Sequence, residues 1–83
     1  MKKENKTSLI EHPQHYGGAD NPYEAIKVIE AWDLGFCLAN VIKYISRNGK
    51  KSGESDIKDL EKALWYLDRE ITNRKKNSKE IIE

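Results

Sequence analysis

The fold is decided by residues 56–73, which read DIKDLEKALWYLDREITN. Hydrophobic side chains recur in this segment at intervals of three, four, three and four residues, the strongest periodicity in the chain. This spacing predicts an amphipathic helix to about Asn73, capped at its start by Ser55 or Asp56, with one apolar stripe that forms core. The stripe consists of Ile57, Leu60, Leu64, Leu67 and Ile71.

A second helix is predicted upstream, over residues 22–33. Asn21 can cap this helix, Pro22 suits its first position, and Glu24 stands where a capping box needs an acid. Apolar residues then recur at helical spacing, and Gly35 is a natural terminator.

A third helix is predicted between these two, over residues 36–47, where the dipeptide Asn48-Gly49 ends it. At about 100° per residue its apolar side chains fall on one side of the helix. They are Leu38, Val41, Ile42 and Ile45, with Cys37 near the border of the stripe as a small core residue.

The three predicted helices belong to one helical domain, residues 11–73, with a further segment on each side of it. Residues 1–10 are polar and lysine-rich and are expected to form a flexible arm, and residues 74–83 form a charged tail that is expected to fray. The lead from Glu11 to Asn21 contains proline, glycine and aspartate, so it is expected to be irregular. The predicted fold class is all-α, with three helices and an irregular N-terminal lead.

Composition favours a small helical oligomer, a dimer or a tetramer. The chain has 83 residues, of which 37% are hydrophobic and 35% are charged, so its own core must be thin. A single cysteine excludes an internal disulfide, which leaves self-association as the usual source of further stability. A net charge of +1 makes nucleic acid an unlikely partner, and no apolar run is long enough for a membrane span or a signal peptide.

One side of the helix over residues 36–47 carries the chemistry that a nucleotide needs. Asn40, Lys43 and Arg47 lie within about 60° of one another, away from the predicted core. Cations pair with phosphate oxygens and aromatic rings stack on bases, although an ordinary solvated helix face would look similar. The candidate ligand-binding residues are Asn40, Lys43, Tyr44, Arg47, Lys50 and Tyr66, together with His15 and Tyr16 from the lead.

Trp65 projects well away from the apolar stripe of the helix over residues 56–73. A large indole is seldom left in water, so it is expected to pack against another subunit, to stack on a ligand, or to be covered by the N-terminal arm. Lys62 and Arg69 lie near it on the helical wheel. We expect Trp65, Lys62 and Arg69 to form the subunit interface.

No metal site, cofactor or catalytic residue is predicted. His12 and His15 are too few for a metal site, and hydrogen bonds that anchor the lead explain them better. Residues 49–52, GKKS, look like a phosphate loop, but Tyr44 stands where the first glycine is needed and Lys51 where a serine or threonine is needed. The acidic residues are scattered, so no carboxylate pair for magnesium is evident.

Three stretches carry a resemblance to a known family. They are residues 12–16, HPQHY, residues 40–50, NVIKYISRNGK, and residues 59–67, DLEKALWYL. In this order they resemble the SaV-like family of small bacteriophage proteins, catalogued as a domain of unknown function, and the resemblance spans about residues 11–71. It implies a protein of the cytoplasm of the infected bacterial host.

The resemblance leaves more than one function open. Some phage members carry the label nucleotide kinase, acting on deoxynucleoside monophosphates, and small phage proteins of this general kind also sequester cyclic dinucleotides of bacterial antiviral defence. A kinase needs an in-line donor, an acceptor and charge neutralisation, whereas a sponge needs only affinity. We therefore expect a non-catalytic, oligomeric sponge for a cyclic dinucleotide, with a deoxynucleoside monophosphate kinase and an inhibitor of a host protein as alternatives.

Overall fold

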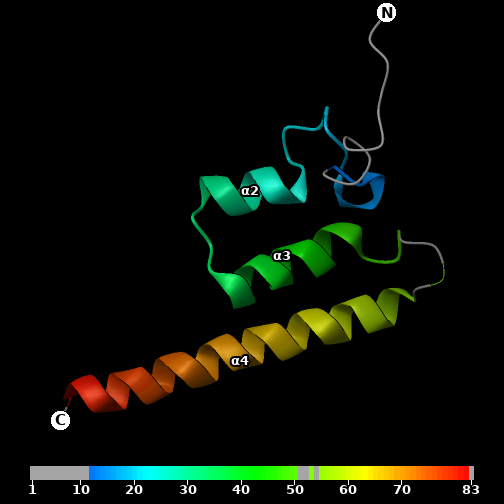
Figure 1. Cartoon of the computed structure of the whole chain (residues 1–83). Coiled ribbons are helices and arrows are strands. Elements are labelled where there is room, and N and C mark those ends of the chain that lie inside the picture. The colour runs from blue at the N-terminus through cyan, green and yellow to red at the C-terminus, as the bar shows by residue number, and fades with distance from the viewer. Residues whose placement is uncertain (1–11, 51–52, 54, 83) are drawn as a thin grey trace, which may run out of the picture.

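The computed structural model describes residues 12–50, 53 and 55–82 (Figure 1). A short 3-10 helix, η1 (Gln14–Tyr16), precedes three α-helices. These are α2 (Ala25–Ala31), α3 (Phe36–Arg47) and α4 (Asp56–Ile82). The described residues contain no strand, so the predicted all-α class with three helices is confirmed.

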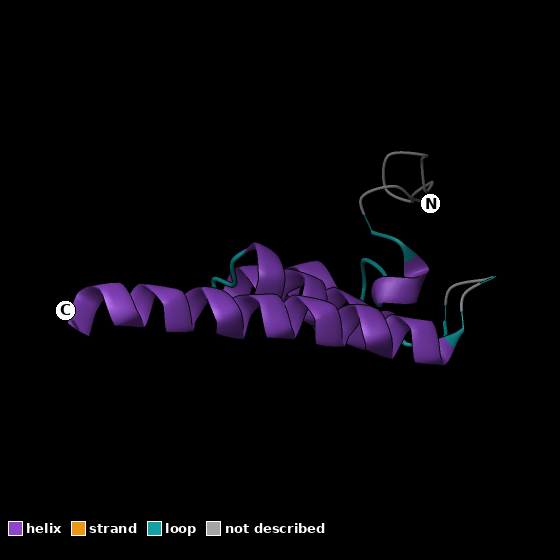
Figure 2. Ribbon diagram, turned by 90° about the horizontal axis from the view of Figure 1, so that it is seen from below, coloured by secondary structure: helices purple, strands orange, loops and turns teal. Residues whose placement is uncertain are grey.

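The three helices lie side by side with α3 in the middle. α3 contacts both α2 and α4, and it also contacts η1. Seen from below, the helices overlap in a thin layer rather than wrapping round a common centre (Figure 2). Both faces of such a single layer are left uncovered, so the chain buries little hydrophobic surface of its own.

α4 is longer than the sequence pattern predicted. Its start is as expected, because the Ser55 Oγ accepts a hydrogen bond from the Lys58 N–H at 3.1 Å, the geometry of an N-cap. The expected end near Asn73 is wrong, since the helix continues to Ile82. Lysine, arginine and glutamate are good helix formers, and an ion pair at 2.7 Å between Glu70 Oε2 and Arg74 Nε supports this extension.

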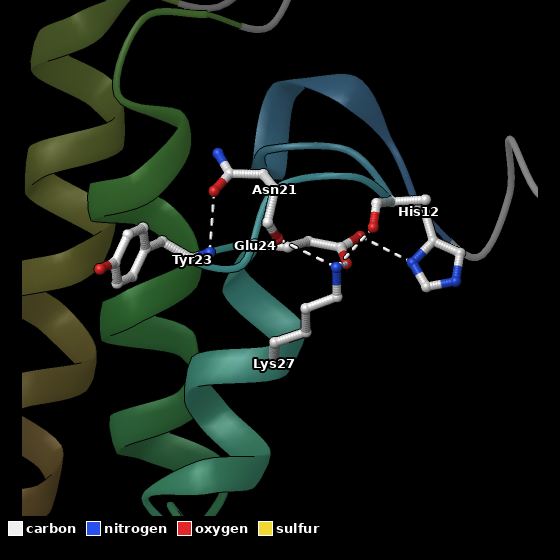
Figure 3. Close-up of polar contacts among 6 residues, drawn as sticks. His12, Asn21, Tyr23, Glu24 and Lys27 are labelled. Atoms are coloured by element: carbon white, nitrogen blue, oxygen red, sulfur yellow. Dashed lines mark hydrogen bonds and ion pairs between the residues drawn. The ribbon is translucent and has the colours of Figure 1, made fainter.

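α2 begins later than predicted, at Ala25 instead of Pro22. The Asn21 side chain does not cap the helix, because its Oδ1 accepts the Tyr23 N–H at 2.8 Å and stabilises a turn (Figure 3). Glu24 therefore precedes the helix instead of closing a capping box, and it is only 1% exposed.

The end of α2 uses an aspartate where the sequence suggested a glycine. Asp33 has a positive φ of 54°, and the Leu34 N–H donates to the Ile29 carbonyl at 3.0 Å. This is the arrangement of a Schellman motif, which caps the last carbonyls of a helix. Gly35, the expected terminator, is instead the N-cap of α3.

The apolar stripe of α4 is not part of the chain's core, which corrects the sequence prediction. Ile57 is 64% exposed and Leu64 is 65% exposed, whereas Asp59 and Ala63 of the same helix are buried against α3. Helix α4 therefore packs on α3 through a different side from the one that periodicity marked. Among the described residues, the buried hydrophobic side chains are Ala25, Val41 and Ala63.

We expect replacement of Asp33 to have opposite effects on stability depending on the new side chain. Asp33→Gly should raise the free energy of unfolding, and Asp33→Ala should lower it by about 1 kcal/mol, because only glycine adopts a positive φ without steric cost. Chemical denaturation followed by circular dichroism measures both. Equal effects of the two substitutions would contradict the assigned backbone conformation.

Candidate functional site

A buried ion pair joins the end of α3 to the start of α4. Arg47 is 3% exposed and Asp59 is 0% exposed. The Arg47 Nε donates to Asp59 Oδ1 at 2.9 Å, and Nη2 lies 2.9 Å from the same oxygen. Because both groups are withdrawn from water, each depends on the other for compensation of its charge.

The second oxygen of Asp59 is held by the backbone of the connecting turn. The Gly49 N–H donates to Asp59 Oδ2 at 2.7 Å. Gly49 has a φ of 77°, and a Cβ at this position would lie 3.0 Å from the Cβ of Asp56. The turn thus requires glycine, and its N–H and the guanidinium together use both carboxylate oxygens.

These contacts shift the pKa values of both partners. The Gly49 N–H and the Arg47 guanidinium lower the pKa of Asp59 against the opposing effect of burial. Burial acts to lower the pKa of Arg47, but the hydrogen bonds and charge interactions with Asp59 and Tyr16 together outweigh that effect, and the pKa is raised. The pair is therefore charged at neutral pH.

Arg47 also connects the buried pair to the lead segment and to a surface of tyrosines and lysines. Its Nη1 donates to the Tyr16 hydroxyl at 3.4 Å, and its Cζ lies 4.8 Å from the centre of the Tyr44 ring. Lys43 Nζ lies 5.5 Å from the Tyr44 ring and 5.7 Å from the Tyr16 ring, and Lys62 Nζ lies 5.4 Å from the Tyr44 ring. We define the cation–tyrosine cluster as Tyr16, Lys43, Tyr44, Lys62 and Tyr66.

Tyr66 extends this cluster along α4 into a row of aromatic rings. It stacks on Tyr44 with ring centres 6.0 Å apart. It also packs in T-shaped geometry with Phe36 and with Trp65, with ring centres 5.8 Å and 5.0 Å away. Phe36 is 74% exposed and Trp65 is 60% exposed. Two exposed ring systems therefore flank a half-buried tyrosine pair. We call Phe36, Tyr66 and Trp65 the aromatic row.

A second buried carboxylate stabilises the lead segment. Glu24 Oε2 lies 2.8 Å from His12 Nδ1, and Glu24 Oε1 lies 3.4 Å from Lys27 Nζ (Figure 3). Lys27 also donates to the backbone carbonyls of Ala19 and Asn21, so one turn of α2 holds the loop before it. His12 thus has the anchoring role that the sequence suggested.

The structure brings together only part of the predicted ligand set. Lys43, Tyr44, Tyr66 and Tyr16 converge, and Lys62 joins them although it was expected at a subunit interface. The expectation that Arg47 faces away from the core is wrong, because its charge is needed to neutralise Asp59 in the interior.

The other predicted residues contact the border of this cluster, bind their own helix or are exposed. The Asn40 amide donates to the Phe36 carbonyl of its own helix at 2.9 Å. His15 packs on the Tyr16 ring with centres 4.3 Å apart. Lys50 is exposed after the Gly49 turn, and Arg69 is exposed on α4.

Asp59 and Glu24 are the important residues that sequence reasoning missed. The visible signal for Asp59 is a second periodic face on α4, in which Asp59, Ala63 and Tyr66 recur at intervals of four and three residues. The five leucine and isoleucine side chains of the stripe outweighed this face in a hydropathy pattern. Glu24 gave no comparable signal, because it reads as a capping acid.

The described residues contain neither a cluster of potential metal ligands nor a helix that could span a membrane. No group of three or more histidine, cysteine, aspartate or glutamate side chains is arranged there to hold a metal ion. None of the helices in this part of the chain combines the length and the apolar character that a bilayer crossing requires.

Comparison with known proteins identifies the family. A family model described as a protein of unknown function, DUF3310, matches residues 10–68, and the chain belongs to this family. The Gene 1.7 protein of Enterobacteria phage T3 is 47% identical over 66 residues, which cover 71% of this chain and 39% of that protein. The chain thus spans about two fifths of the length of this phage relative. No solved structure matches.

These matches support a bacteriophage protein family of unknown function. The narrower SaV-like grouping stays a prediction.

We expect Asp59→Asn to destabilise the fold strongly. The amide leaves the buried Arg47 guanidinium without a compensating charge, so the unfolding midpoint should fall by roughly 10 °C or more. Asp68→Asn is the matched control, because Asp68 is exposed on the same helix. Thermal unfolding followed by circular dichroism compares the two, and equal small losses would show that the pair contributes little.

Stability should also fall at acid pH in a way that depends on Asp59. The folded-state pKa is lowered, so the ionised carboxylate stabilises the fold above the unfolded-state value of about 3.9, and this contribution is lost as pH falls through the folded value. Denaturant titrations from about pH 5 to about pH 3 should show a steeper loss for the parent than for Asp59→Asn. Parallel curves would contradict this assignment.

Proposed function

We propose that this protein binds a phosphorylated nucleotide on the cation–tyrosine cluster and the aromatic row. The observation that carries the proposal is the convergence of two lysines on one tyrosine ring, with Lys43 and Lys62 ammonium groups 5.5 and 5.4 Å from the centre of Tyr44. Arg47 beside them is already paired with Asp59, so the ammonium groups of Lys43 and Lys62 are the cations that we propose for phosphate. Such a surface attracts phosphate.

A cyclic dinucleotide is the ligand class that we favour. Such a ligand carries two bases and two phosphates, and the surface offers two exposed ring systems, Phe36 and Trp65, and two lysines. Stacking on an aromatic side chain contributes about 1–3 kcal/mol per base. A homo-oligomer would present each of these groups more than once, which suits a ligand with two similar halves.

Binding without chemistry fits the described carboxylates better than phosphoryl transfer does. Transfer normally uses carboxylates that hold magnesium beside the reacting phosphates. Among the described residues the buried acids are Asp59, which Arg47 and Gly49 bind, and Glu24, which lies beside His12 and Lys27. We therefore propose sequestration of the nucleotide, in the cytoplasm of an infected bacterium, as a defence against a host signal.

Lys43→Ala and Lys62→Ala should each weaken nucleotide binding about ten-fold or more. A charge-assisted hydrogen bond to phosphate contributes about 1.5–3 kcal/mol, and about 1.4 kcal/mol corresponds to a factor of ten. Lys76→Ala is the matched control, because Lys76 is exposed on α4 beyond the cluster. Titration calorimetry with cyclic di-adenylate, cyclic di-guanylate and deoxynucleoside monophosphates measures the affinities.

Chromatography of the recovered ligand separates the alternatives. An intact cyclic dinucleotide supports sequestration, whereas conversion of a monophosphate by a triphosphate donor would replace it with a kinase. If the parent binds none of these nucleotides, or if both variants bind as the parent does, the cluster is not a nucleotide site. Arg47→Ala is unsuitable for this test, since it also removes a buried structural charge.

A further inference from the structure

The apolar stripe of α4 lies on the outside of the chain. Exposure along it runs from 39% at Leu67 to 65% at Leu64. The hydrophobic side chains buried within the described residues are two alanines and Val41. Because burial of apolar surface contributes about 25 cal/mol per Å², the side chains with most to contribute to stability are those that the single chain leaves in water.

The stripe and the aromatic row occupy different flanks of α4. Asp59 and Ala63 mark the side that faces α3. At about 100° per residue, Leu64 and the rest of the stripe centre about 100° round the helix in one direction, while Trp65 lies more than 100° round in the other. A partner centred on the stripe therefore leaves Phe36 and Tyr66 uncovered, whereas Trp65 borders the contact, because Leu64 and Trp65 line one shallow hollow.

The second half of α4 also has no neighbour within the described part of the chain. Phe36, the first residue of α3, packs on Tyr66. The residues of α4 after Tyr66 therefore extend beyond the N-terminal end of α3 (Figure 1). At 1.5 Å per residue, α4 is about 40 Å long and α3 about 18 Å long. A helical segment as short as this overhang is marginal in water on its own, so Ile71 and the turns after it need an external contact.

The distribution of charge along α4 indicates which partner covers the stripe and in which direction that partner runs. Residues 56–68 carry three acidic and two basic side chains besides the buried Asp59, and residues 69–78 carry four basic and one acidic side chain. A parallel second copy would place like charges together, whereas an antiparallel copy places the acidic half beside the basic half. Antiparallel helix dipoles also attract.

We infer that α4 binds α4 of a second copy of this chain, antiparallel and stripe to stripe. One register opposes Leu64 to Leu67 and Leu60 to Ile71, and it repeats both pairings by two-fold symmetry. In this register, Glu61 of one copy and Lys75 of the other lean toward each other, because helical side chains point toward the N-terminus. The contact does not depend on nucleotide binding.

Leu64→Glu should convert the dimer into a monomer at micromolar concentration in analytical ultracentrifugation. It places a carboxylate at the centre of the contact, beside the neighbouring acid Asp68. Thr72→Glu is the control, because Thr72 lies away from the stripe on the exposed surface of α4. A monomeric parent, or a Leu64→Glu variant that sediments as the parent does, would overturn the inference.

Cross-linking tests the direction without a disruptive charge. In a Cys37→Ser background, a mixture of the Leu60→Cys and Ile71→Cys variants should form a disulfide-linked dimer of one variant with the other. Either variant alone should not, because the two copies of position 60 lie about 16 Å apart along the axis, beyond the reach of a disulfide. Efficient linking of either variant to itself would show a parallel pair, and no linking in the mixture would exclude this register.

Discussion

The buried ion pair between Arg47 and Asp59 is the constraint on which the rest of the structure depends. Its carboxylate fixes the last turn of α3, the Gly49 turn and the first turns of α4, while its guanidinium reaches Tyr16 in the lead. Removal of either charge would leave the other buried without a partner. The end of α3, the Gly49 turn, the start of α4 and the lead are therefore held together as one unit. The pair also sets the positions of Lys43 and Tyr44, one turn earlier on α3, and of Lys62, one turn later on α4.

Local sequence signals predicted the helices well and their packing poorly. Residues 36–47 form a helix as expected, and Ser55 caps α4, because glycine, serine and helical periodicity act within a few residues. The strongest apolar stripe nevertheless points out of the chain. Periodicity identifies a side that avoids water, but it does not identify which molecule covers that side. An oligomer and a larger core give the same pattern in one sequence.

The candidate site was predictable in composition but not in its connections. Lys43, Tyr44 and Tyr66 could be proposed from helical spacing and residue type, and they do lie together. The sequence could not show that Arg47 has a structural role instead of a ligand-binding one, because the two kinds of arginine look alike until the acid that pairs with it is known. That acid, Asp59, lies on another helix, and the contact across the helix pair carries no local signal.

The short connection between α3 and α4 has a consequence for the order of folding. Gly49 and Asp59 are ten residues apart, and a loop of that size closes in about 10–100 ns. The loss of chain entropy on closure is correspondingly small, and the contact forms between elements that are adjacent in sequence. The α3–α4 hairpin can therefore form before α2 and the lead dock against it.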